Sequence, residues 1–142
     1  MLPKETNRIV LDTNILLDIL VFEDASIIGL KEDIQSGLLI AWTRDEILEE
    51  FREVIARATF ALEPDHQERL VQQARELHQI DNTSILTPAP FRCSDPDDQV
   101  FLDLALKLTP CLLISKDKEV LKLKSQARQY GVLISKSYKQ ID

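Results

Sequence analysis

The sequence contains few of the residues that build disulfide frameworks or zinc sites. Among its 142 residues there are two cysteines, Cys93 and Cys111, and two histidines, His66 and His78. The cysteines form no CxxC pair and no set with the histidines at the spacing of zinc ligands. We therefore expect idle or buried thiols, and we assign the histidines, which lie in a polar helical stretch, to the solvated surface. Neither a disulfide framework nor a zinc centre is expected.

Long hydrophobic segments are also missing. The longest apolar run, residues 15–22, is interrupted by Asp18 and is far shorter than the ~20 residues that a membrane-spanning helix needs. The first residues, MLPKETNR, have none of the features of a secretory signal, such as an apolar middle or a small-residue cleavage site. These observations predict a protein without a membrane span, and the cytosol is its expected location.

Positive charge is in deficit, because 17 lysines and arginines face 24 acids and the net charge is −7. This balance argues against a protein that coats nucleic acid through many phosphate contacts. It does not exclude a nuclease, since an acidic metal site lowers the net charge while basic residues still line one rim. The length and the 44% of hydrophobic residues favour one folded domain over residues 1–142, with its core at about 8–136.

Apolar strands alternate with helical segments along the chain. Strands are predicted at residues 8–11, 38–42, 111–115 and 132–135. Helices are predicted at residues 15–22, 25–36, 45–58, 64–79, 95–108 and from 117 onward. Residues 86–96 hold three prolines and are expected to be extended or irregular. This alternation indicates an α/β fold with a parallel sheet covered on both faces.

Three acids are predicted to lie at one edge of that sheet. Asp12 directly follows the first strand, and Asp117 lies two residues after the strand that contains the run CLLI. Asp98 lies in the first turn of a helix that enters from the same edge. In open parallel sheets, ligands bind beyond the carboxyl ends of the strands, so acids placed there are candidates for a functional site.

Helical angles select one more acid from the helix at 45–58. At 100° per residue, Glu50 lies at the margin of the apolar face, beside Ile47 and Val54, whereas the other glutamates of this helix point away. In the helix at 95–108, the same geometry turns Asp98 toward the apolar side. It assigns three residues to a polar surface stripe: Gln99, Asp103 and Lys107. The predicted acids are thus Asp12, Glu50, Asp98 and Asp117.

Each of the acids next to a helix start could serve only as a helix cap or as a favourable charge for the helix dipole. Gathered together, however, two carboxylates about 4 Å apart repel by roughly 4 kcal/mol at an effective dielectric constant of 20. A dication would relieve this repulsion, and hard oxygen ligands suit Mg²⁺ or Mn²⁺. Asn14 and Ser115 are neutral groups beside this ring, suited either to holding a carboxylate or to turn formation and capping.

Four blocks of sequence resemble the PIN-domain family when they are taken in order. They are LDTNIL at 11–16, EILEEFREVIAR at 46–57, DPDDQVFLDLALKL at 95–108 and LLISKD at 112–117. The chain is most similar to the bacterial branch that supplies toxin components of toxin-antitoxin systems, and the resemblance covers about residues 8–136. It implies a three-layer α/β/α sandwich and an Mg²⁺- or Mn²⁺-dependent endoribonuclease that hydrolyses RNA with metal-activated water.

By position, the resemblance implies that the four catalytic and metal-binding acids are Asp12, Glu50, Asp98 and Asp117, supported by Asn14 and Ser115. It also implies a homodimer and a small antitoxin protein as partners. Two positions depart from the family pattern. Lys116 stands where relatives often have a small residue, and Gln99 stands where many have another acid. Asp97 is the less favoured substitute for Asp98.

Two other functions fit parts of the pattern. A non-catalytic PIN-like module would bind RNA or a partner protein without cutting it. A phosphatase with Asp12 as aspartyl nucleophile is a poorer fit, because the dehalogenase-like motif has a second Asp where this chain has Asn14.

Overall fold

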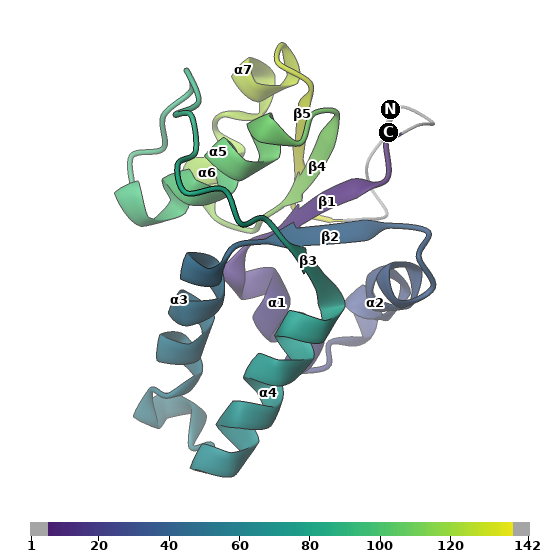
Figure 1. Ribbon diagram of the computed structural model, residues 1–142, viewed down its shortest axis with the longest axis vertical. Helices are drawn as coiled ribbons and strands as arrows, with labels where there is room; N and C mark the ends of the chain where they lie inside the picture. Colours follow the sequence, from purple (N-terminus) through teal and green to yellow (C-terminus); the bar gives the residue numbers. More distant parts are fainter. Residues whose placement is uncertain (1–5, 138–142) are drawn as a thin grey trace.

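The computed structural model describes residues 6–137, and its centre is a sheet of five strands (Figure 1). The strands are β1 (Arg8–Leu11), β2 (Ile40–Thr43), β3 (His78–Ile80), β4 (Cys111–Ile114) and β5 (Val132–Ser135). Their order in the sheet is β3-β2-β1-β4-β5, and every neighbouring pair is parallel. The carboxyl ends of all five strands therefore lie at one edge.

Helices cover both faces of this sheet, as predicted. In Figure 1 the lower layer contains α1 (Thr13–Leu20), α2 (Ile28–Gln35), α3 (Asp45–Ile55) and α4 (Pro64–Leu77). The upper layer contains α5 (Gln99–Lys107), α6 (Lys118–Leu121) and α7 (Lys124–Arg128). Short 3₁₀ turns occur at Ala25–Ile27, Ala58–Phe60 and Pro96–Asp98. The structure is a three-layer α/β/α fold with a parallel sheet, which confirms the predicted fold class.

The sheet separates two hydrophobic cores. Ile9 and Leu11 of β1 pack into the core on the side of α1 to α4, whereas Val10 packs into the core on the side of α5 to α7. In β4 the same alternation sends Leu112 to the first core and Leu113 to the second. Side chains of a strand point alternately to opposite faces, so a strand covered on both faces is apolar at every position.

Helix α1 is buried at every residue except Asn14. It lies beneath the sheet among α2, α3 and α4, where a helix that is hydrophobic on nearly all sides belongs. Within residues 6–137, none of the helices combines the length and the apolar character needed to cross a bilayer. The burial of α1 fixes the position of its first residues, which follow directly from β1.

The sequence did not predict β3. Residues 78–80 were assigned to the end of a helix, but they form a short strand beside β2 in which His78 lies opposite Ala41. Three residues with a polar centre carry too little periodicity to be distinguished from a helix end. Only pairing with β2 makes them a strand, which is a tertiary effect.

Several helix boundaries also differ from the predicted ones. The first helix begins at Thr13 rather than at residue 15, directly after Asp12. The segment predicted as one helix from residue 117 is two short helices, because the chain turns at 122–123 before α7 begins. These shifts are of the size expected for assignments made from local sequence.

His78 is buried, so its assignment to the solvated surface was wrong. Its side chain is packed at the junction of α4 and β3, and Nδ1 lies 2.6 Å from the carbonyl oxygen of Ala74. His66, in contrast, is exposed. Burial lowers the pKa of the His78 imidazole, although the Ala74 carbonyl opposes the shift by favouring a protonated Nδ1.

This burial predicts an acid-sensitive contribution to stability. Since the pKa of His78 is depressed in the folded chain, its neutral form stabilises the fold above about pH 6.5, and this contribution is lost as the pH falls. One such proton changes the free energy of unfolding by at most about 1.4 kcal/mol per pH unit. We expect His78→Asn to show a smaller loss between pH 7 and pH 5 than the unmodified protein, measured by urea unfolding. The matched exposed variant His66→Asn should retain the full loss; an equal change in both variants would exclude His78 as the source.

Candidate active site at the carboxyl edge of the sheet

Asp12 lies at the end of β1, where the chain enters α1. Its backbone N–H donates to the carbonyl of Ile114 on β4, so β1 and β4 together set its position. The residue occupies the N-cap position of α1, but its side chain forms no capping hydrogen bond. The carboxylate instead accepts a 2.5 Å hydrogen bond from the hydroxyl of Ser115. Helix capping alone therefore does not explain this acid.

Ser115 connects two of the predicted acids. Its side chain is fully buried, and its hydroxyl donates to Oδ2 of Asp12 while accepting a 3.1 Å hydrogen bond from the backbone N–H of Asp117. Its own backbone N–H donates to Ser135 on β5. The hydroxyl is thereby fixed in orientation, and it holds the Asp12 carboxylate beside the strand end from which Asp117 projects.

Asp117 caps α6, which is one of the two roles weighed for it. Its Oδ1 accepts hydrogen bonds from the backbone N–H groups of Glu119 at 2.8 Å and Val120 at 3.4 Å. The side chain is only half-buried, and Asp117 raises the pKa of both Asp12 and Asp98. Asp117 therefore caps α6 and also belongs to the acidic group.

Asp98 is held at the start of α5 by a short 3₁₀ turn. Asp95 caps this turn by accepting from the backbone N–H of Asp97, with Pro96 in the first helical position. The Asp98 side chain makes no capping hydrogen bond to α5. Burial, then repulsion from Asp12 and Asp117, raises its pKa from 3.8 to about 7.

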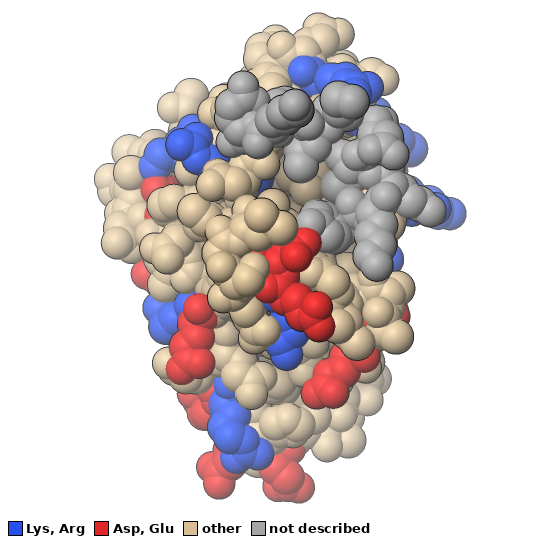
Figure 2. Space-filling view, turned by 90° about the vertical axis from the view of Figure 1, so that its right-hand side faces the viewer, with Lys and Arg blue, Asp and Glu red and all other residues tan. Residues whose placement is uncertain are grey.

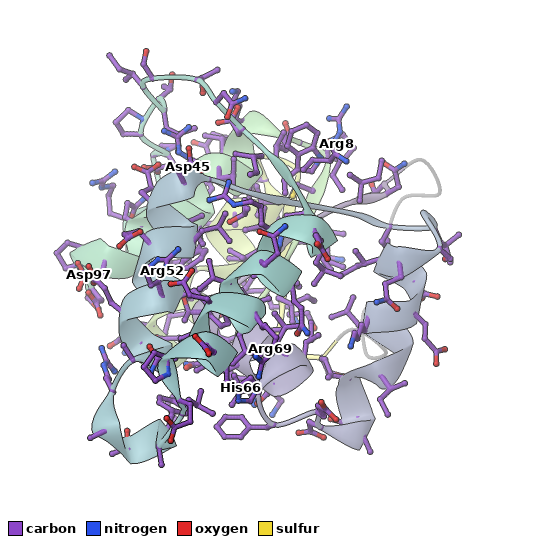
Figure 3. The ribbon with its side chains drawn as sticks, turned by 60° about the horizontal axis from the view of Figure 1, so that its bottom comes forward. Arg8, Asp45, Arg52, His66, Arg69 and Asp97 are labelled. Atoms are coloured by element: carbon purple, nitrogen blue, oxygen red, sulfur yellow. The ribbon has the colours of Figure 1, made fainter. Side chains whose placement is uncertain are left out.

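Glu50 faces the same region from α3. It is half-buried, whereas Glu46, Glu49 and Glu53 of this helix are exposed, as the helical angles predicted. Burial raises the pKa of the Glu50 carboxyl, and repulsion from Asp12 raises it further. Charges from the turn before α5 also reach it, and Figure 3 shows one of these residues, Asp97, at the outer margin beside α3.

These acids lack neutralising partners. Within residues 6–137, no lysine or arginine forms an ion pair with any of the four acids Asp12, Glu50, Asp98 and Asp117. Two basic residues adjacent to or near these acids in sequence are engaged elsewhere: Lys116 pairs with Asp18 of α1, and Arg52 pairs with Glu49 and Glu68. The negative charge at this edge is left to other cations.

The same part of the chain does not present a preformed ligand cage. Among residues 6–137, no three His, Cys, Asp or Glu side chains converge closely enough to hold one metal ion. Asn14, predicted as a supporting residue, is exposed at the start of α1. The four acids thus fit a dication by donor type and by uncompensated charge, and the side chains must move closer together to ligate it.

The PIN-domain family model matches residues 8–119. The chain belongs to the PIN-domain family. The match begins at β1 and reaches α6, so it includes all four acids and the strands that present them. Proteins of this family are generally nucleases, which act on nucleic acids and typically use divalent metals. Among the curated proteins compared with this chain, none matches it.

An irregular segment, residues 81–95, crosses this PIN domain from β3 to the 3₁₀ turn before α5. It is anchored near its start by Asp81, which accepts from Nη1 of Arg44 at 2.6 Å and from Nζ of Lys107 at 2.5 Å. Burial works against ionisation of Asp81, but these cations and Thr83 lower the pKa of its carboxyl below the usual value. The segment therefore has a fixed path toward Asp98.

Gln99 anchors the other end of the segment, and its assignment to a surface stripe was wrong. The side chain is buried; Oε1 accepts from the backbone N–H of Cys93 at 2.7 Å, and Nε2 donates to the carbonyl of Phe91 at 3.2 Å. Nε2 also donates to Asp103, which is half-buried and accepts from Ala89 as well. Helical angles could not show this, because the partners come from an irregular segment with no periodicity.

The raised pKa of Asp98 predicts that its charge weakens the metal-free PIN domain. Because this pKa lies above the unperturbed value of 3.8, the group stabilises the fold below about pH 4, and that contribution is lost as the pH rises to 7. Asp98→Asn should therefore increase the free energy of unfolding at pH 8 in EDTA by roughly 1 kcal/mol, since solvent screens a partly exposed charge. The gain should vanish near pH 4. The matched variant Asp97→Asn removes a neighbouring exposed charge that reaches Glu50, and it should change the pH dependence less than Asp98→Asn does. Equal effects would contradict the assignment.

The Gln99 contacts predict a large stability loss for a substitution of similar volume. Gln99→Leu leaves the buried groups of Phe91 and Cys93 without partners and should lower the free energy of unfolding by about 2–3 kcal/mol. Asp103→Asn keeps the acceptor oxygen for Ala89 and Gln99 and is the matched control, with an expected loss below about 1 kcal/mol. Chemical denaturation of both variants checks this, and a Gln99→Leu protein as stable as the control would show that these hydrogen bonds do not anchor the segment.

Proposed function

We propose that this PIN domain is a metal-dependent endoribonuclease whose catalytic acids are Asp12, Glu50, Asp98 and Asp117. The observation that carries the proposal is the group of carboxyls at the carboxyl edge of the sheet, among which burial, together with repulsion from neighbouring acids, raises the pKa values of Asp12, Glu50 and Asp98. A folded protein can keep such repulsion if a cation offsets it when the protein functions. Acids with perturbed pKa values of this kind are candidates for functional sites.

The residues of the chain have distinct proposed roles. The Ser115 hydroxyl holds one oxygen of Asp12, and the other oxygen is the proposed ligand. Asp117 is held through its backbone N–H by the same serine and through Oδ1 by α6. Glu50 and Asp98 approach from α3 and from the 3₁₀ turn before α5, so the four acids that would hold the dication come from separate elements.

Mg²⁺ or Mn²⁺ is the proposed ion, because the donors are carboxylate oxygens and no histidine or cysteine belongs to the set. When bound, the ion would lower the pKa of a water molecule and stabilise the charge that develops on the phosphodiester. With its pKa near 7, Asp98 can lose its proton as the cation binds, so ion binding and proton release are coupled.

A role as the toxin component of a toxin-antitoxin system is part of the proposal. It is supported by the likeness of the sequence blocks to that branch of the family and by nothing in the geometry alone. In this role the protein would act in the cytosol as a homodimer, with a small antitoxin protein that blocks the acidic edge.

A non-catalytic RNA- or partner-binding module is the second candidate. The observation in its favour is that no three potential ligand side chains within residues 6–137 converge on one point. Calorimetric titration separates the two candidates, since a nuclease of this type binds Mn²⁺ or Mg²⁺ and a binding module has no need to. An absence of binding at millimolar ion would favour the second candidate.

Cleavage is the direct test. Purified protein should cut mixed single-stranded RNA in the presence of Mg²⁺ or Mn²⁺ but not of EDTA, as resolved on denaturing gels. Asp12→Asn and Asp98→Asn should each lower the cleavage rate by about 100-fold or more, because each removes charge from the proposed metal site. Asp97→Asn is the matched control and should keep at least about half of the rate. Unchanged cleavage by Asp12→Asn would exclude the assigned site, and a phosphorylated Asp12 trapped on a phosphate ester would indicate the phosphatase instead.

Growth tests the proposed toxin role separately. Expression of the unmodified chain alone should slow bacterial growth, and expression of Asp12→Asn at the same level should not. Normal growth with the active enzyme would leave the nuclease in place and remove the toxin role.

A further inference from the structure

The described end of the chain has a charge opposite to that of the rest. Residues 118–137 contain five basic residues and one acid, although the whole chain has a net charge of −7. The basic residues are Lys118, Lys122, Lys124, Arg128 and Lys136, and the acid is Glu119. All five basic side chains are exposed. This segment therefore forms a positively charged surface on an acidic protein, and we call these five residues the basic surface.

The basic surface is organised by the two short helices. Lys118 and Lys122 are four residues apart, as are Lys124 and Arg128, so each pair lies on one side of its helical segment. Lys122 pairs with Glu119, and the other four have no ion-pair partner among residues 6–137. Four exposed cations in one segment, without ion-pair partners among the described residues, are groups that phosphates can contact.

This surface begins at the acidic edge. Asp117, the N-cap of α6, directly precedes Lys118, and Lys136 follows Ser135, whose carbonyl pairs with Ser115. The carboxyl ends of β4 and β5 thus bring cations to the border of the four acids. Figure 1 shows α6 and α7 in the upper layer, the side of α5. Figure 2 views the molecule from the side opposite this edge, where acidic and basic side chains are mixed over the lower part of the face.

An exposed aromatic ring lies at the other end of the surface. Tyr130 follows α7, is 49% exposed, and its ring lies 5.6 Å from the ring of buried Phe91. Phe91 is followed by the exposed Arg92 and the half-buried Cys93. Burial raises the pKa of the Cys93 thiol, and the nearby charge of Asp98 raises it further, which places this segment close to the acids. The supported ring is a platform on which a base can stack, beside cations that contact phosphates.

We propose that the basic surface and Tyr130 bind a single-stranded RNA segment next to the scissile phosphodiester, with its backbone along α6 and α7 and one base stacked on Tyr130. The identity of the ligand rests on the proposed ribonuclease function. A cleft of acids repels RNA, so a flanking positive surface supplies the attraction that the catalytic edge lacks. The bound RNA would run from Tyr130 toward Asp117.

Binding without cleavage tests the surface. The probe is a fluorescein-labelled single-stranded polyuridine RNA of about 15 nucleotides, and the anisotropy of the full chain is measured in EDTA at several salt concentrations. The triple variant Lys118→Gln/Lys124→Gln/Arg128→Gln should raise Kd about tenfold or more. It should also reduce the slope of log affinity against log salt by about 2, since each lost phosphate contact removes about 0.7 on single strands.

The matched control removes the same charge elsewhere. Arg57→Gln/Arg69→Gln/Arg75→Gln changes three exposed arginines after α3 and on α4. Figure 3 shows Arg69 well away from Asp97, which marks the acidic side. This variant should change Kd by less than about threefold. Equal losses in both triple variants, or an unchanged Kd in the first, would overturn the proposal.

Tyr130 and a competitor test whether the ligand is RNA. Tyr130→Ala should raise Kd about fivefold or more, and Tyr130→Phe should not, because stacking needs only the ring. Polyglutamate of similar charge should compete less well than unlabelled RNA. Competition as strong as that of RNA, together with an unchanged Tyr130→Ala affinity, would assign the surface to an acidic protein and overturn the proposal.

Cleavage assays in Mn²⁺ then separate the two claims. If the unmodified protein cuts RNA and the Lys118 triple variant cuts and binds equally well, the surface is excluded and the nuclease stands. If the protein binds RNA through the surface but never cuts it, the surface stands and the proposed function fails.

Discussion

The structure depends on negative charge that the chain gathers at one edge of its sheet without neutralising it. Burial and mutual repulsion raise the pKa values of Asp12, Glu50 and Asp98, while lysines and arginines form their ion pairs elsewhere. A fold pays for such a group in stability unless a cation binds there. The chain belongs to the PIN-domain family, whose members typically use divalent metals, and this uncompensated charge is the feature on which the proposed function rests.

Hydrogen bonds to the backbone and to single carboxylate oxygens hold this edge in place. Ser115 links the Asp12 carboxylate to the backbone of Asp117, and both are fixed by pairing of β1, β4 and β5. Asp98 depends on a different device, because Gln99 and Asp81 fix the irregular segment that leads to it. A buried network of this kind is strong when every member is satisfied, and it orients a carboxylate without consuming its charge.

Charge is distributed unevenly along the chain. Acids dominate the chain up to Asp117, and the basic surface follows directly after it. The net charge of −7 thus averages two regions of opposite sign and argues only against non-specific coating of nucleic acid. An acidic edge bordered by cations gives a polyanion one direction of approach, which a uniformly charged surface does not.

The sequence by itself determined what depends on local order. Its apolar runs predicted four of the strands. The 100° rotation per residue in α3 predicted that Glu50, unlike the other glutamates of that helix, faces the interior. Only the tertiary structure decided what depends on contacts between distant segments. Residues 78–80 are a strand because β2 lies beside them, and Gln99 is buried because an aperiodic segment folds over it. The periodicity of a sequence shows which side of a helix or strand is apolar. It gives no information about contacts with an irregular segment, whose own sequence has no periodic pattern.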